Sequence, residues 1–169
     1  MLVDSHCHLD FPGLAEDREA VIARAAAAGV GIIQTIGTRL ATFDRVLAIV
    51  DAHEGVFCSV GVHPHQAAEE PLDGPAPLLA RTSHPKVIGI GEAGLDYHYD
   101  HSPRAAQADG FRAHMRAARA SGLPLIVHTR EADEDTIAML RAGMAEGRFE
   151  GVVHCYSSSA ELGRAAVAV

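Results

Sequence analysis

The feature that most constrains the fold is a regular alternation of strand-forming and helix-forming segments. Apolar, β-branched runs predict six strands, at residues 2–8, 30–37, 56–65, 86–96, 123–131 and 149–157. Amphipathic or alanine-rich segments predict helices at residues 15–29, 38–55, 76–83, 102–122, 132–146 and 159–169. Strands that are apolar on both faces and separated by helices are typical of a parallel sheet buried between or beneath helices. The chain is therefore expected to fold as an α/β protein.

Length and composition agree with one globular domain over residues 1–169. The hydrophobic content of 48% and mean hydropathy of +0.08 are those of a soluble protein. No apolar run has the roughly 20 residues of a membrane span, and no signal peptide is evident. Three scattered cysteines do not form a disulfide framework, so a cytoplasmic location is expected. No obligate protein partner is indicated.

The alternation fits both an open doubly wound sheet and a (β/α)8 barrel. In an open sheet the functional loops gather near one switch point, whereas in a barrel every strand ends at the same mouth. Here polar side chains follow five of the six strands: His6 and His8, His63 and His65, Glu92, His128, and His154. This distribution favours the barrel. A barrel takes about 250 residues and eight strands, so only about six βα units are present and we expect the chain to be truncated at its C-terminus.

The pair His6 and His8 is the first candidate metal site. Residues two apart on a strand point to the same side, so both imidazoles face one way. Two neutral imidazoles suit zinc, manganese or iron, although an isolated pair is more often simply hydrogen-bonded. Glu92 ends an apolar run, where a carboxylate is costly unless it is paired or bound to metal.

His128 and His154 each follow an apolar strand, and with Glu92 they complete a set of metal-type ligands on one predicted rim. Two cations bridged by Glu92 would activate a water for phosphoester or amide hydrolysis. The proline in His63-Pro64-His65 makes substrate contact or proton transfer more natural than shared ligation. Arg130, near the same rim, is a candidate phosphate clamp, and the alternative is an ordinary surface arginine. Cys155 is expected to be a buried packing residue.

The net charge of −8 argues against general nucleic-acid binding, because the chain has no field that attracts phosphates. Any phosphate-bearing substrate must be held locally, by bound cations or a few arginines. A two-metal site would supply that positive charge itself.

Six segments, in order and register, resemble the TatD family of metal-dependent deoxyribonucleases, within the amidohydrolase-like barrels. They are DSHCHLD, GVHPH, GEAGLDY, SPRAAQ, LPLIVHTREA and HCYS. The resemblance implies that His6 and His8 bind one metal, that His128 and His154 bind the second, and that Glu92 bridges. It also implies that His63 and Arg130, and less firmly His65, contact substrate phosphate.

The same resemblance implies two divalent cations (Mg²⁺, Mn²⁺ or Zn²⁺) and hydrolysis of nucleic acid, commonly as a 3′→5′ exonuclease on single-stranded DNA. The family's late aspartate, a metal ligand and proton acceptor, would lie beyond Val169, so we expect the 169-residue chain to be catalytically impaired. After His154 the family has Ser-Gly-Ser, whereas this chain has three serines.

Two alternatives stay open. One keeps the metal site but changes the substrate to another ester or amide, such as a phosphotriester, a lactone, a cyclic amide or D-aminoacyl-tRNA. Related barrels that cleave such small substrates often bridge their metals with a carboxylated lysine, but the single lysine, Lys86, begins a strand and so lies at the wrong end. The other alternative is a metal-binding fragment without catalytic activity.

Overall fold

The computed structural model describes all 169 residues and contains six βα units. The strands are β1 (Leu2–Cys7), β2 (Val30–Ile36), β3 (Val56–Val60), β4 (Val87–Asp96), β5 (Leu125–Arg130) and β6 (Gly151–Val153). The helices are α1 (Arg18–Ala27), α2 (Phe43–Ala52), α3 (Ala76–Leu79), α4 (Arg104–Ser121), α5 (Asp133–Glu146) and α6 (Ala160–Ala168), with short 3₁₀ turns at Ala15–Asp17 and Pro64–Gln66.

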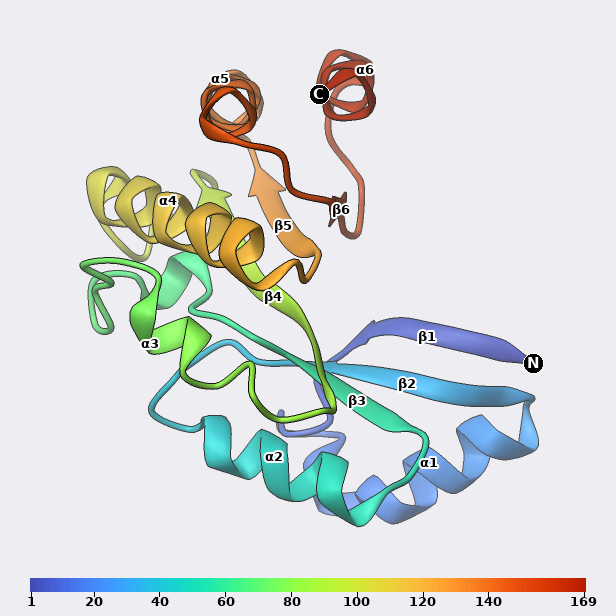
Figure 1. Ribbon diagram of the computed structural model, residues 1–169. Coiled ribbons are helices and arrows are strands. Elements are labelled where there is room, and N and C mark those ends of the chain that lie inside the picture. The colour runs from blue at the N-terminus through green and yellow to red at the C-terminus, as the bar shows by residue number, and fades with distance from the viewer.

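The six strands form one sheet in the order in which they occur along the chain, and every neighbouring pair is parallel. The sheet curls, with its helices on the outside, so that β1 and β6 form its two edges (Figure 1). A doubly wound sheet would reverse its strand order at a switch point. The unreversed order is that of a barrel wall, and the predicted barrel-type arrangement with six βα units is confirmed.

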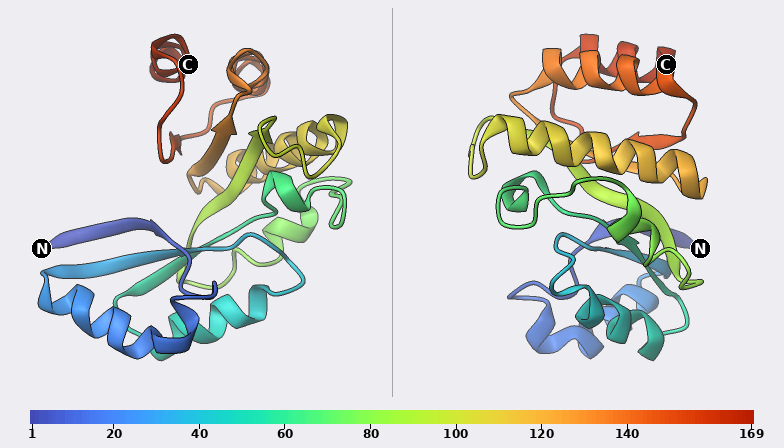
Figure 2. Two further views of the ribbon diagram at one scale, coloured as in Figure 1. Left: turned by 180° about the vertical axis from the view of Figure 1, so that it is seen from behind. Right: turned by 60° about the vertical axis from the view of Figure 1, so that its left-hand side comes forward.

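The main core consists of strand and helix residues that pack against one another, and the two further views show the helices that cover the sheet (Figure 2). Helix α2 buries Phe43, Val46 and Val50 on one face, which is the spacing of three to four residues that an amphipathic helix requires. Helix α4 buries Phe111 and Met115 in the same way. These faces hold the strands in place, and none of the helices has the combined length and hydropathy needed to cross a bilayer.

Two strands differ from the expectation of full burial. In β1, Leu2 is 62% exposed and Val3 is 58% exposed, and in β6 Val152 is 54% exposed. Each of these strands has a hydrogen-bonded neighbour on one side only, so both faces and one edge are less covered than in β3 or β4. The sequence-based prediction of buried strands holds for the centre of the sheet and is wrong for its edges.

His114, on α4, is a buried histidine remote from the strand ends. Its Nδ1–H donates to the carbonyl of Gly110 at 2.7 Å, and its Nε2 accepts the N–H of Val62 at 2.9 Å. Burial lowers the pKa of His114 from 6.5 to about 4. His114 is completely buried and so forms part of the packing around α4.

This burial predicts a pH-dependent stability. Between pH 6.5 and about 4 the unfolded chain binds a proton at His114 that the folded chain does not, so stability falls as the pH falls. The expected loss reaches about 3 kcal/mol. Denaturant unfolding across this range should show a steeper pH slope for the wild type than for His114→Gln, whose amide replaces both hydrogen bonds. If the two proteins lose stability equally as the pH falls, His114 is not the group responsible for the pH dependence.

Candidate metal centre

The candidate ligands reach one end of the sheet because parallel strands present their carboxyl ends together. His6 lies in β1 and His8 directly follows it, while His128 lies in β5 and His154 follows β6. Glu92 lies in the middle of β4, which ends four residues further on at Asp96, as does the predicted strand over residues 86–96. Glu92 is only 2% exposed.

The two carboxylate oxygens of Glu92 face two different groups of imidazoles. Oε2 is 3.4 Å from His6 Nε2 and 3.8 Å from His8 Nε2. Oε1 is 2.9 Å from His128 Nδ1 and 2.5 Å from His154 Nε2. One carboxylate therefore lies between a pair of imidazoles from β1 and another pair from β5 and β6.

His63 joins the second group, with Nε2 at 3.5 Å from Glu92 Oε1. Donor atoms lie close enough together to hold a metal ion in two sets, namely His6, His8 and Glu92, and His63, Glu92 and His128. Geometry alone does not separate His63, expected to contact substrate, from the residues expected to be ligands. Its Nδ1 accepts the backbone N–H of His65 at 3.2 Å, which leaves Nε2 as the nitrogen turned toward the cluster.

Several of these imidazole nitrogens are buried without a hydrogen-bond partner. They are both ring nitrogens of His6, Nδ1 of His8 and Nδ1 of His154. Buried polar atoms are normally paired, and five imidazoles cannot all be satisfied by the one carboxylate among them. A divalent cation accepts the lone pair of a neutral imidazole, so the donor set fits metal ions of the kind that nitrogen and carboxylate ligands bind.

The local pKa shifts favour an ionised Glu92 and neutral His8 and His63. At His128, by contrast, burial is outweighed by the carboxylates of Glu92 and Asp96, which raise the pKa of the imidazole. Burial alone raises the pKa of Glu92, but hydrogen bonds from His128 and His154 outweigh it and hold the pKa below its ordinary value. Burial lowers the pKa of His8 and of His63 despite the nearby carboxylate. Deprotonated histidines and a charged carboxylate are the forms in which these residues bind metal.

Asp96 is a buried residue of this site that the sequence analysis did not single out. Its Oδ2 lies 2.8 Å from His65 Nε2 and 3.0 Å from His128 Nε2. Burial raises its pKa, but the N–H of Tyr99 and both imidazoles outweigh that effect and lower the pKa to about 2. It lies in the GEAGLDY segment, four residues after Glu92. Residues an even number of positions apart on a strand face the same side of the sheet, so this spacing could have indicated that Asp96 belongs to the site.

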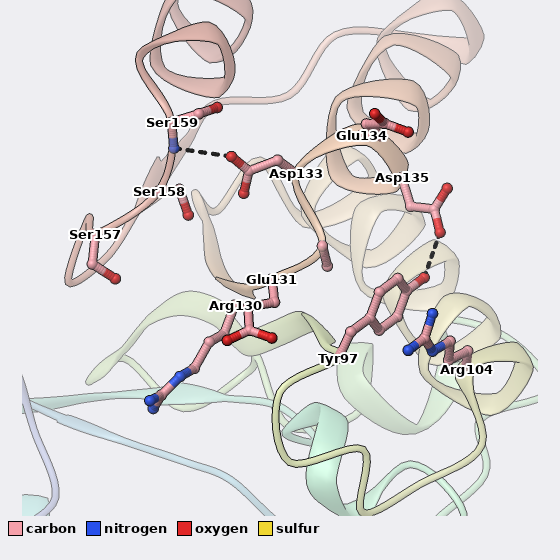
Figure 3. A pocket seen from close by; sticks show the side chains of 11 residues that line it. Tyr97, Arg104, Arg130, Glu131, Asp133, Glu134, Asp135, Ser157, Ser158 and Ser159 are labelled. Atoms are coloured by element: carbon pink, nitrogen blue, oxygen red, sulfur yellow. Dashed lines mark hydrogen bonds between the residues drawn. The ribbon is translucent and has the colours of Figure 1, made fainter.

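Two cavities open at this end of the sheet. One, of about 340 Å³, is lined by His8, Phe11, Thr38, His63, His65, Gln66, Glu92, His128 and His154. The other, of about 780 Å³, is lined mainly by polar residues of the loops after β4, β5 and β6 (Figure 3). Arg130 lines this second cavity and not the first, so it is placed beside the histidine cluster rather than within it.

Cysteine chemistry does not contribute to the site. Burial raises the pKa of Cys7 and of Cys58 to about 12, so both remain protonated thiols. Cys155 is exposed, which corrects the expectation that it packs in the interior. It lies in the loop after the short strand β6, where the chain has already left the sheet.

The sequence matches a known family over nearly its whole length. The profile of the family described as "TatD related DNase" matches residues 3–168. The chain belongs to this family. The match includes every strand and helix that positions the histidine cluster, so the resemblance carried by six short segments is confirmed.

Among its TatD-family relatives is a Bacillus subtilis protein named "Uncharacterized metal-dependent hydrolase YabD", 36% identical over 97% of this chain and 64% of that protein. A Cronobacter turicensis protein named "3'-5' ssDNA/RNA exonuclease TatD" is 36% identical over 90% of this chain and 57% of its own length. The crystal structure of the Escherichia coli TatD homologue YJJV superposes with a TM-score of 0.88 at 30% identity, covering 99% of this chain and 64% of that one. The chain thus spans about three fifths of the length of these relatives.

Proposed function

We propose that this site binds two divalent cations and belongs to a metal-dependent hydrolase. His6 and His8 would hold one ion, His128 and His154 the other, and Glu92 would bridge them, with His63 beside the second ion. The observation that carries the proposal is the division of five imidazoles between the two oxygens of one buried carboxylate.

Divalent cations at such a site supply a nucleophile near neutral pH by lowering the pKa of water, and they stabilise the negative charge of an in-line displacement. The chain's own residues hold the imidazoles in place, and burial favours the neutral form of His8 and His63. Asp96 accepts a hydrogen bond from the nitrogen of His128 that faces away from Glu92. This fixes the tautomer and ring orientation, as carboxylates behind metal-binding histidines commonly do.

We further propose that the substrate is a phosphodiester of single-stranded nucleic acid, cleaved from the 3′ end. The family description and the name of the Cronobacter turicensis relative support this substrate class. His63, His65 and Arg130 are proposed as substrate contacts. Because the chain carries a net charge of −8, these side chains and the bound cations would provide the positive charge that the rest of the molecule lacks. Free cysteines are consistent with a reducing, cytoplasmic setting.

The proposal is tested by a metal titration combined with a nuclease assay. Calorimetric titration of the metal-stripped protein with Mn²⁺ or Zn²⁺ should give two bound ions. Shortening of end-labelled single-stranded DNA should then proceed from its 3′ end, should require metal, and should be slow, in keeping with the impaired activity expected of this chain. Binding without cleavage of any substrate would favour a metal-binding fragment, and cleavage of a small ester but not of DNA would favour the other hydrolases. Failure to bind either ion would overturn the proposal.

Asp96 offers a test of the ring-orienting role. Asp96→Asn keeps an oxygen for the backbone N–H groups of His98 and Tyr99 but loses the negative charge beside His65 and His128. Metal affinity is expected to fall roughly 10- to 100-fold, which is typical when the partner of a metal-binding histidine is changed. Calorimetry with Mn²⁺ measures this fall. An unchanged affinity for Mn²⁺ would mean that Asp96 only holds the loop of His98 and Tyr99 in place and does not orient the histidines.

A further inference from the structure

Tyr99 is an unusual aromatic residue beside the histidine cluster. It lies in the loop after β4 and is 50% exposed, whereas most of the other aromatic rings are wholly or partly buried. The two other exposed aromatic rings are engaged locally: Phe11 stacks on His8 with ring centres 4.4 Å apart, and Tyr156 packs against α6 at Gly163. Burial in the core does not account for the position of Tyr99.

The backbone of this loop is held by the same buried carboxylate that contacts the cluster. Asp96 Oδ1 accepts the N–H of His98 at 3.1 Å and the N–H of Tyr99 at 2.9 Å. Its other oxygen contacts His65 and His128. The position of the Tyr99 backbone is therefore tied directly to that of the imidazoles beside Glu92.

Cationic and aromatic groups surround the exposed ring. The guanidinium carbon of Arg130 lies 4.9 Å from the ring centre, and the imidazole of His101 is parallel to the ring at 5.6 Å. His65 meets the ring edge-on at 5.4 Å. A half-exposed aromatic ring with a guanidinium over it is a combination with which proteins bind single-stranded nucleic acid, since the ring stacks on a base and the cation accompanies the backbone.

The charged side chains near Arg130 affect where the phosphates of a nucleic acid can bind. The larger cavity, which Arg130 helps to line, carries four carboxylates, from Glu131, Asp133, Glu134 and Asp135, and only one other guanidinium, from Arg104 (Figure 3). The excess of negative charge opposes phosphate groups there. This charge distribution favours phosphate groups at the histidine cluster over the larger cavity, and the uncharged face of a base is the part of a nucleotide suited to the ring of Tyr99.

We propose that Tyr99, flanked by Arg130, is a stacking platform for a nucleobase of the single-stranded substrate, adjacent to the nucleotide whose phosphate lies at the metal centre. This inference rests on the proposed function. It assigns to Tyr99 a base-binding role that does not depend on base identity, because every base offers a flat aromatic face.

The test compares two short phosphorothioate-linked single strands of equal length, one carrying thymine at every position and the other abasic. Both have the same backbone charge, so only the bases differ. Binding to the full chain with Mn²⁺ is measured by fluorescence anisotropy. Tyr99→Ala is expected to weaken binding of the thymine strand by roughly 5- to 150-fold, the range for loss of one base–aromatic contact. Tyr99→Phe, which keeps the ring, should bind as the wild type does.

Tyr156→Ala is the matched control, because it removes a similarly exposed tyrosine that packs against α6. It should leave binding of the thymine strand unchanged, and thermal melting checks that each variant is folded. The proposal is contradicted if the wild type binds the thymine strand and the abasic strand equally, or if Tyr99→Ala weakens binding of both strands to the same degree. Cleavage of unmodified DNA by the wild type is scored separately, so the platform can fail while the proposed nuclease function stands, and the reverse.

Discussion

Glu92→Gln is expected to weaken binding of both metal ions by more than about 100-fold, beyond the loss typical of a change behind the ligands. The substitution preserves the size of the side chain but removes the charge that both groups of imidazoles share. Glutamine also has only one acceptor oxygen, so it cannot present an oxygen to each group. Calorimetric titration with Mn²⁺ or Zn²⁺ measures the loss, and metal-dependent cleavage should disappear with it.

The matched control is Glu70→Gln. Glu70 is also a partly buried carboxylate, but it accepts the backbone N–H of Leu40 and lies outside the histidine cavity. Its substitution should leave metal affinity unchanged. If Glu92→Gln binds two ions as tightly as the wild type, the carboxylate does not bridge them, and the histidines would have to hold the metal alone.

Gly94→Ala is expected to produce the largest loss of stability, about 4 kcal/mol or more. Gly94 has φ = +150°, a conformation that residues with a Cβ rarely adopt. A Cβ at this position would collide with the backbone carbonyl of His128 on the neighbouring strand. The collision involves backbone on both sides, so β4 and β5 would have to separate next to the candidate ligands.

Denaturant unfolding measures this loss, and Gly122→Ala separates its two causes. Gly122 ends α4 with φ = +72° but has no atom within 4 Å of an added Cβ. Gly122→Ala should therefore cost only about 1 kcal/mol, the effect of the backbone conformation alone. A similar small cost at Gly94 would show that the two strands move apart easily and that their spacing does not position His128.

Much of the architecture was predictable because the periodicity of apolar residues is a local property of a sequence. Parallel strands between helices bring their carboxyl ends together, so residues such as His6 and His128 were expected to meet before any coordinates were known. The exposure of Leu2 and Val152 was not predictable in this way, since an apolar run does not reveal whether a strand has one neighbour or two.

The details of the site depended on contacts that no local pattern encodes. The predicted strands over residues 86–96 and 123–131 already included Asp96 and Arg130, which do pair, but the sequence does not show which imidazoles of the other strands face Glu92. Asp96 was overlooked because a single aspartate before a loop usually caps a turn, which Asp96 also does at His98. Its second role, toward His65 and His128, appears only when three strands are brought together.

The unreversed strand order has a further consequence for the folding energetics of the molecule. The edge strands β1 and β6 form no hydrogen bonds with each other, yet the rings of His6 and His154 stack with centres 3.9 Å apart. These residues come from opposite ends of the chain, so ions shared through Glu92 would act as a cross-link that closes a very long loop. Such a cross-link opposes fraying of both edges at once, and its stabilisation grows with the concentration of free metal.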